Sequence, residues 1–276
     1  MSTSIPPRRA WVEEIMGMPV SVHLRGPGVD SDEVAQHVAG VFVELRAVDA
    51  MFNPAHADSQ IARLNRGEID FSGCHPAIRT VHGLCEEAHT RTDGFFNPWL
   101  PDPEAKGGYR YDPSGLVKGW AVQRIADRLA DLDGHDLCLN AGGDVVLTTV
   151  PGHPVWRVGI EDPAEPNRML RVCAIATGAV ATAGAAHRGG LVVNPYTGAD
   201  ATELRSVTVA GPSLLWADVF AIAAVARGAE GLDWLMGLDD YEALVVDADG
   251  DLCTTGGWDR LVLSTSDPNL YTSQTA

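Results

Sequence analysis

The most constraining feature of the sequence is a segment that is apolar on nearly all sides. Leu214–Arg227 (LLWADVFAIAAVAR) has the length of a helix and leaves no polar face for water, so we predict a buried helix. Asp218 has only apolar near neighbours there, and a buried carboxylate must find a partner or become protonated. Asp218 is therefore either a capping or salt-bridged residue near the helix start or a ligand for a divalent cation. A hard cation such as Mg²⁺ takes few protein carboxylates together with substrate phosphates.

Hydrophobic periodicity predicts the other elements, which do not alternate strictly between strand and helix. Further helices are expected from about Ser31, over Ser59–Asn65, over Pro76–Thr90 and over Gly115–Leu132. Strands are expected at Met18–Leu24, Leu137–Leu139, Val145–Thr149, Trp156–Ile160, Leu170–Ile175 and Val207–Ala210, and a hairpin at Ala243–Asp247 and Leu252–Thr255. This order favours an α+β fold, a mostly antiparallel sheet packed with helices, in a single domain over residues 1–276.

Charge and cysteine content restrict the partners and the compartment. The chain has 20 Lys and Arg against 37 Asp and Glu, a net charge of −17, which argues against nucleic acid or an anionic membrane surface as a partner. Five cysteines at irregular spacings do not indicate a disulfide framework. The sequence shows neither a signal-peptide pattern nor a long apolar stretch, so we expect a cytoplasmic protein without a membrane span.

Three segments rich in small residues indicate an anionic ligand. They are Asp112–Gly115 ahead of Lys118, Asn140–Asp144 and Ala176–Gly184. Turns of this kind let backbone N–H groups approach phosphates, although each is also compatible with a structural turn. Lys118 stands out because it is one of only two lysines in the chain. The Rossmann and P-loop glycine motifs are both absent from the sequence.

A second constellation is compatible with zinc. His82, Cys85 and His89 would share one face of the helix predicted over Pro76–Thr90, and His75 precedes them by one heptad. A stripe of polar side chains on a helix surface explains the same spacing, and the sequence offers no second ligand pair nearby.

Taken in order, the motifs of this chain resemble one family, the ApbE-type FAD:protein FMN transferases. The resemblance runs from Met16 to about Arg227 and is carried by nine landmarks. They are MGMPV, DSQIARLN, DGFFNP, YDPSGLVKGWAVQRIADRL, NAGGDV, VGIEDP, AIATGAVATAG, VVNPYTG and SVTV followed by ADVFAIA.

The resemblance implies an ApbE-like, T-fold-related architecture, FAD and Mg²⁺ as cofactors, and a flavoprotein acceptor. Members of the family transfer the FMN half of FAD to a Thr or Ser of that partner and release AMP. The positions that the motifs mark as flavin-nucleotide contacts are Met16, Phe95, Phe96, Asn97, Asp112, Lys118, Gly142, Gly143, Asp144, Thr182 and Val192. The Gly115 carbonyl and the Asp218 carboxylate are implied as metal ligands.

The chain departs from the family pattern at positions that carry charge or oxygen ligands. The family's aromatic stacking residue is Ala55 here, its usual Asp is Asn97, and Ile222 replaces a hydroxyl ligand one helical turn after Asp218. The usual His-Ile-Ile-Asp-Pro segment reads Leu-Val-Val-Asn-Pro at 191–195, and Ala183 replaces the Ser of ATSG. His187 is the candidate to replace the missing histidine as a catalytic base.

These departures leave three alternatives to flavin transfer open. The chain could bind FAD or another nucleotide without catalysis, cleave the FAD pyrophosphate without an acceptor, or serve as a scaffold that binds no flavin.

Overall fold

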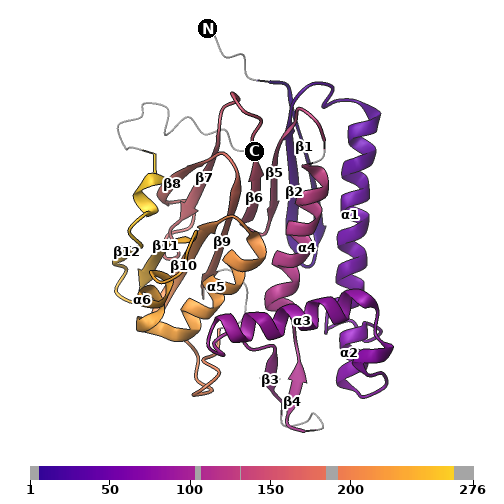
Figure 1. Ribbon diagram of the computed structural model, residues 1–276, viewed down its shortest axis with the longest axis vertical. Coiled ribbons are helices and arrows are strands. Elements are labelled where there is room, and N and C mark those ends of the chain that lie inside the picture. Colours follow the sequence, from indigo (N-terminus) through magenta and orange to yellow (C-terminus); the bar gives the residue numbers. More distant parts are fainter. Residues whose placement is uncertain (1–5, 103–106, 131, 185–191, 264–276) are drawn as a thin grey trace.

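An antiparallel sheet of eight strands forms the centre of the fold (Figure 1). The computed structural model describes residues 6–102, 107–130, 132–184 and 192–263. The strand order across the sheet is β1-β2-β5-β6-β9-β10-β11-β12. These strands are β1 (Arg8–Ile15), β2 (Met18–Arg25), β5 (Asp136–Ala141), β6 (Asp144–Thr148), β9 (Gly178–Gly184), β10 (Leu204–Gly211), β11 (Glu242–Asp247) and β12 (Leu252–Thr254). Two separate hairpins accompany it: β3 (Trp99–Pro101) with β4 (Tyr109–Tyr111), and β7 (Trp156–Glu161) with β8 (Met169–Ile175).

The helices of the described residues are α1 (Asp32–Phe52), α2 (Gln60–Asn65), α3 (Pro76–Arg91), α4 (Ser114–Leu129), α5 (Leu214–Arg227) and α6 (Gly231–Leu235). Helices α1, α4, α5 and α6 contact strands of the sheet, whereas α2 contacts α1 and β4, and α3 contacts α4. The hydroxyls of Ser31 and Ser59 accept backbone N–H groups at the starts of α1 and α2, as serine N-caps do. Among the helices of the described residues, none combines the length and the apolar character needed to cross a membrane.

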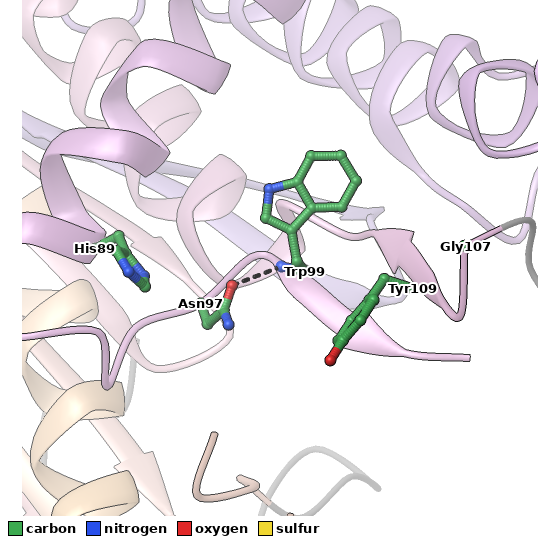
Figure 2. A pocket seen from close by; sticks show the side chains of 5 residues that line it. All are labelled: His89, Asn97, Trp99, Gly107 and Tyr109. Carbon is green, nitrogen blue, oxygen red and sulfur yellow. Dashed lines mark hydrogen bonds between the residues drawn. The ribbon is translucent and has the colours of Figure 1, made fainter. Parts of the chain in front are cut away.

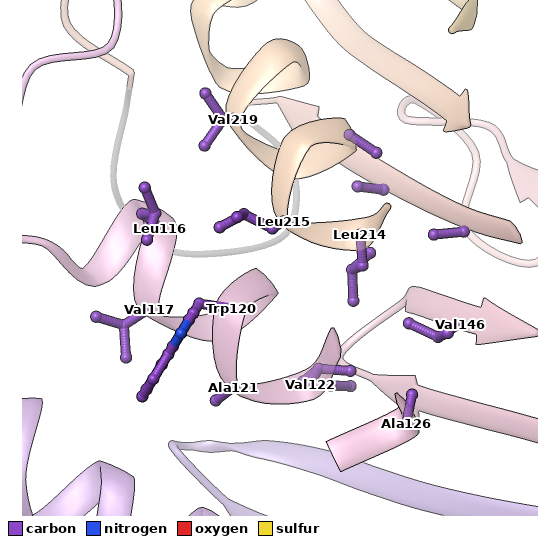
Figure 3. Close-up of a cluster of buried hydrophobic side chains, with 14 of the residues drawn as sticks. Leu116, Val117, Trp120, Ala121, Val122, Ala126, Val146, Leu214, Leu215 and Val219 are labelled. Atoms are coloured by element: carbon purple, nitrogen blue, oxygen red, sulfur yellow. The ribbon is translucent and has the colours of Figure 1, made fainter. Parts of the chain in front are cut away.

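Strand β6 shows how the sheet separates two apolar cores. Val146 belongs to the main core under the helices, whereas Val145 and Leu147 belong to a second core under the β7–β8 hairpin. Successive side chains of a strand point to opposite faces, so this split places helices on one side of the sheet and the hairpin on the other. Within the main core, side chains of α4 face side chains of α5 (Figure 3).

The structure confirms the α+β class and most of the predicted elements. The predicted buried helix has the same bounds as α5, and nearly all its residues are buried. Helix α4 begins at Ser114 and ends at Leu129, three residues before the predicted end at Leu132. The strand β1 was not predicted.

One prediction is wrong: most of the small-residue segment Ala176–Gly184 is the strand β9 rather than a turn. Ala179, Ala181 and Ala183 face the main core, where α5 packs on β9. Small side chains let a helix lie close to the sheet, which explains the composition of this strand without a phosphate.

Candidate functional site

Two tight turns meet at one end of the sheet. Met16 and Gly17 turn β1 into β2, and Gly142 and Gly143 turn β5 into β6, all four with positive φ. A Cβ on Gly142 would come within 2.7 Å of the Met18 sulfur, so the two turns touch. The Gly142 N–H donates to the Pro19 carbonyl at 3.0 Å and the Gly143 N–H to Asn140 Oδ1 at 2.9 Å. Both donors are thus engaged within the protein rather than directed at a ligand.

A buried charged cluster lies beside the second turn. The Lys118 ammonium, on α4, donates to Asp144 at the start of β6 and lies 3.0 Å from Oδ2 of Asp218 on α5. The exposed fractions are 6% for Lys118, 1% for Asp144 and 2% for Asp218. One ammonium thus contacts two buried carboxylates. The structure therefore brings together the three ionisable residues that the sequence singled out.

The three side chains meet because α4 and α5 cross closely at Gly119. A Cβ at this position would lie 3.1 Å from Leu215 Cα and 3.3 Å from Asp218 Cβ. Any larger residue would push the helices apart, and with them Asp218 away from Lys118. Leu214, Leu215 and Val219 on α5 surround the same crossing (Figure 3). The Lys-Gly pair in the α4 motif thus supplies both the cation and the close contact.

Thr182 connects the cluster to the middle of the sheet. Its backbone N–H donates to Asp144 Oδ1 at 3.1 Å, and its hydroxyl shares a hydrogen bond of 2.9 Å with the Thr208 hydroxyl. Thr208 is fully buried on β10. Asp144 is therefore held from two directions, by Lys118 and by β9.

Apolar side chains surround the first turn of α4 at Gly115. A Cβ there would lie 3.4 Å from Ile222 Cδ1 and 3.4 Å from a ring carbon of Phe96. Ile222 lies one helical turn after Asp218 on α5. Apolar atoms of Ile222 and Phe96 therefore border the Cα of Gly115.

Of the predicted contacts, Asn97 lines a cavity of about 540 Å³, together with His89, Trp99, Gly107 and Tyr109 (Figure 2). In this view His89 and Asn97 stand opposite Tyr109. Asn97 Oδ1 accepts the Trp99 N–H at 2.9 Å, and Asp112 Oδ1 accepts the Ser114 N–H at 3.1 Å at the start of α4. A cavity of this size is within the range of small-molecule sites.

Two other predicted site residues are less closely tied to the cluster. Val192 is partly buried against the main core, and its carbonyl accepts the Ala201 N–H at 2.8 Å. His187 lies outside the described residues, as does Leu191, so the structure places neither of them.

The histidines and the cysteine of α3 have separate packing roles. His82 stacks on Phe71 with ring centroids 4.1 Å apart, and His89 Nδ1 lies 3.2 Å from the Phe96 carbonyl oxygen. Cys85 is buried, and burial raises the pKa of its thiol to about 12. In the described part of the chain, no three His, Cys, Asp or Glu side chains gather into a metal-binding group.

Sequence reasoning missed several residues around the site. Tyr109 lies outside the landmarks, and Thr208 lies within the SVTV landmark but was not among the predicted site residues. Arg227 offered a signal, since it is a cation at the end of an otherwise apolar helix and contacts Phe95 and Asp93. Its significance depends on which loop the end of that helix meets, which local sequence does not show.

Comparison with solved structures finds the same fold in ApbE proteins. The ApbE protein of Thermotoga maritima superimposes with a TM-score of 0.79 at 18% identity, covering 94% of this chain and 100% of that one. The flavin transferase ApbE of Vibrio cholerae gives 0.76 at 18% identity, over 92% and 99%. The flavinyl transferase ApbE of Pseudomonas stutzeri, in its apo form, gives 0.75 at 20% identity, over 95% and 100%.

The sequence comparisons identify the family directly. No curated protein sequence matches this chain significantly. The model of the ApbE family matches residues 103–256, which include α4, the β5–β6 turn and α5. More than half of the chain is thus matched, and it contains all three members of the buried charged cluster. The chain belongs to the ApbE family.

Proposed function

We propose that this protein is an FAD:protein FMN transferase. It binds FAD with Mg²⁺, cleaves the pyrophosphate, transfers FMN to a Thr or Ser hydroxyl of a flavoprotein acceptor and releases AMP. The observation that carries the proposal is the buried cluster of Lys118, Asp144 and Asp218 beside the first turn of α4. Family membership and the similarity to flavin transferase structures support the same reaction.

The cluster fits a divalent metal that is held mainly by its nucleotide. Asp218 and the Gly115 carbonyl are the protein ligands we propose, because a hard divalent cation takes carboxylate and carbonyl oxygens. The Ile222 methyl near Gly115 supplies no oxygen, so substrate phosphates and water must complete the coordination. When bound, Mg²⁺ would neutralise charge on the pyrophosphate oxygens.

The protein's own groups supply charge, position and a base. Lys118 limits the repulsion between Asp144 and Asp218, and the cavity beside Asn97 gives the flavin room. In the transfer, the acceptor oxygen bonds to the FMN phosphorus, the bond from that phosphorus to the bridging oxygen breaks, and AMP leaves with the bridging oxygen. The acceptor hydroxyl loses a proton, and His187 is the residue we propose to accept it.

An assay of AMP release tests this function. The protein is incubated with FAD, MgCl₂ and a peptide carrying a Thr or Ser acceptor, and AMP and flavinylated peptide are measured. We expect both products from the wild-type protein and neither from Asp218→Asn. AMP with FMN but no modified peptide would instead assign FAD pyrophosphatase activity. If the wild-type protein releases no AMP above background, and Asp218→Asn behaves identically, the transferase proposal is wrong.

A second candidate is a flavin-binding protein without transferase activity. The apolar contact of Ile222 and Phe96 around Gly115 favours it, because it removes an oxygen from the implied metal site. The variant Ile222→Thr restores a hydroxyl, and we expect about a tenfold gain in Mg²⁺ affinity in the presence of FAD, measured by calorimetry. Ile222→Val is the matched control, since it shortens the side chain without adding oxygen. Transferase activity that appears only in Ile222→Thr would establish the silent state of the natural chain.

We also propose the cytoplasm as the compartment. All five cysteines are free, as is usual where thiols are kept reduced.

A further inference from the structure

The C-terminal residue of α5, Arg227, contacts Phe95, one of the predicted flavin contacts. Its guanidinium carbon lies 4.2 Å from the centroid of the Phe95 ring and 4.6 Å from that of Trp234. The side chain is only 10% exposed. A guanidinium between two aromatic faces is stabilised by cation–π attraction, which strengthens when water is excluded.

The same guanidinium binds the chain just before Phe95. Arg227 Nη2 donates to the Thr92 carbonyl at 3.0 Å and lies 2.6 Å from Asp93 Oδ2. Asp93 and Gly94 have φ of 50° and 81°, in the left-handed region. Such a conformation is unfavourable for Asp and persists only where surrounding contacts hold it.

Tyr196 holds this turn from the other side. Its hydroxyl donates to the Asp93 carbonyl, and its ring packs edge-on against Phe95 with centroids 5.0 Å apart. A Cβ on Gly94 would collide with the Tyr196 hydroxyl, so this close contact requires glycine. Arg227 and Tyr196 therefore both bind the short Asp93–Gly94 turn, which leads into Phe95.

We propose that Arg227 is a positioning residue for flavin binding: it sets the Asp93–Gly94 turn and thereby the place of Phe95 in the flavin pocket. The inference rests on the proposed function, which assigns Phe95 to that pocket. Asp218 and Arg227 lie nine residues apart on α5, about 13 Å along the helix axis. One helix thus carries both a member of the charged cluster and the residue that holds the turn before Phe95.

Arg91 provides a matched control. Its guanidinium carbon lies 3.9 Å from the Trp216 ring centroid and 5.0 Å from that of Phe220, so it makes the same kind of stacking contact. Its ion-pair and stacking partners are Glu87, Trp216 and Phe220, which lie outside the turn before Phe95. A general loss of aromatic stacking would therefore affect Arg91 variants as much as Arg227 variants.

The test is an FAD titration of the full-length protein with Arg227→Gln, Arg227→Lys and Arg91→Gln. We expect Arg227→Gln to weaken FAD binding about tenfold or more, Arg227→Lys to restore part of it, and Arg91→Gln to stay within about twofold of wild type. The visible absorption bands of the flavin at saturation should shift in Arg227→Gln and match wild type in Arg91→Gln, which a purely structural role of Arg227 would not produce.

Thermal unfolding separates misfolding from misplacement. If Arg227→Gln does not fold, Tyr196→Phe removes only the hydroxyl that donates to Asp93, and it should weaken FAD binding in the same direction. If Arg227→Gln folds and shows the FAD affinity and flavin spectrum of the wild type, the inference is overturned. If Arg227→Gln does not fold, the same result in Tyr196→Phe overturns it. A wild-type protein that binds no FAD would overturn the proposed function, and this inference with it.

Discussion

Two buried clusters, one around Asp136 and one around Lys118, lie at opposite ends of the β5–β6 hairpin, and they differ in the number of carboxylates. At the candidate site, Lys118 serves both Asp144 and Asp218. At the other end, the fully buried Asp136 lies 3.0 Å from Arg25 Nε, and its Oδ1 lies 3.0 Å from His153 Nδ1.

The Asp136 cluster contains several hydrogen-bond donors around a single carboxylate. Asp136 Oδ1 also accepts the Val150 N–H at 2.7 Å, and Arg25 stacks on Trp156 with its guanidinium carbon 3.7 Å from the ring centroid. One carboxylate thus has a cation, a backbone donor and a histidine. These contacts hold the 150–156 segment against β2 and β5, and the Arg25 guanidinium compensates the charge of Asp136.

At the candidate site, the ammonium of Lys118 contacts two buried carboxylates. Ionisable groups held in buried clusters gather at functional sites. We therefore expect the Asp136 cluster to contribute mainly to stability and the Lys118 cluster mainly to function.

The largest expected effect is on stability, from removal of each cation. Lys118→Met removes the ammonium that contacts both buried carboxylates, and we expect a loss of about 3–5 kcal/mol in the free energy of unfolding. Arg25→Met leaves Asp136 with His153 and the Val150 N–H, so the expected loss is about 1–3 kcal/mol. Urea unfolding of both variants measures these losses. A smaller loss of unfolding free energy in Lys118→Met than in Arg25→Met would contradict the expected difference between the two clusters.

Neutralising one carboxylate in each cluster should separate stability from function. Asp218→Asn leaves the pair of Lys118 and Asp144, so we expect the free energy of unfolding to stay within about 1 kcal/mol of wild type while flavin transfer is lost. Asp136→Asn leaves the Arg25 charge unbalanced and should cost roughly 2–4 kcal/mol, with FAD affinity unchanged.

Denaturant titration and FAD calorimetry on the same two proteins provide the measurements. Asn is close to Asp in shape, so each substitution changes charge with little change in packing. A strongly destabilised Asp218→Asn would mean that Asp218 is structural, and normal transfer by that variant would remove it from the mechanism.

The smallest expected effect concerns the reactivity of two cysteines, Cys85 on α3 and Cys138 on β5. Burial raises the pKa of Cys85, which neighbours Tyr111, to about 12, and it raises the pKa of Cys138, on β5 near Arg25, to about 12 as well. A raised thiol pKa favours the protonated form, so at pH 8 only about one in ten thousand of either would be thiolate. Cys253 is exposed.

We therefore expect native protein at pH 8 to modify rapidly at Cys253 and to leave Cys85 and Cys138 intact. Labelling with a thiol reagent followed by peptide mass spectrometry measures this, and labelling in urea shows that all sites can react. Rapid native labelling of Cys85 but not Cys138 would show that α3 opens more readily than β5.

Much of the fold could be predicted because its signals are local. The bounds of α5 follow from an apolar run that ends at Gly228, and the serine caps locate the starts of α1 and α2. The strand β9 was misread because its glycine and alanine residues resemble a turn, whereas they serve packing against α5. The strand β1 pairs only with β2, and its alternating polar residues carry a weak signal.

The candidate site could be predicted only as separate parts. Lys118, Asp144 and Asp218 stand out in the sequence through rarity, motif and apolar surroundings, and family resemblance placed all three at one site. Their mutual contacts could not be predicted, because they depend on how closely α4 and α5 cross at Gly119.

Local patterning was therefore enough to specify most of the elements, their order and several chemically reactive residues, since helix period, strand alternation and caps act over a few neighbouring residues. Tertiary structure decided which charged side chains share a site. It also decided that Ile222 and Phe96 lie beside Gly115 and that Arg227 binds the turn before Phe95. The reason is physical: electrostatic and packing energies depend on distances in space, and residues far apart along the chain acquire those distances only when the helices pack on the sheet.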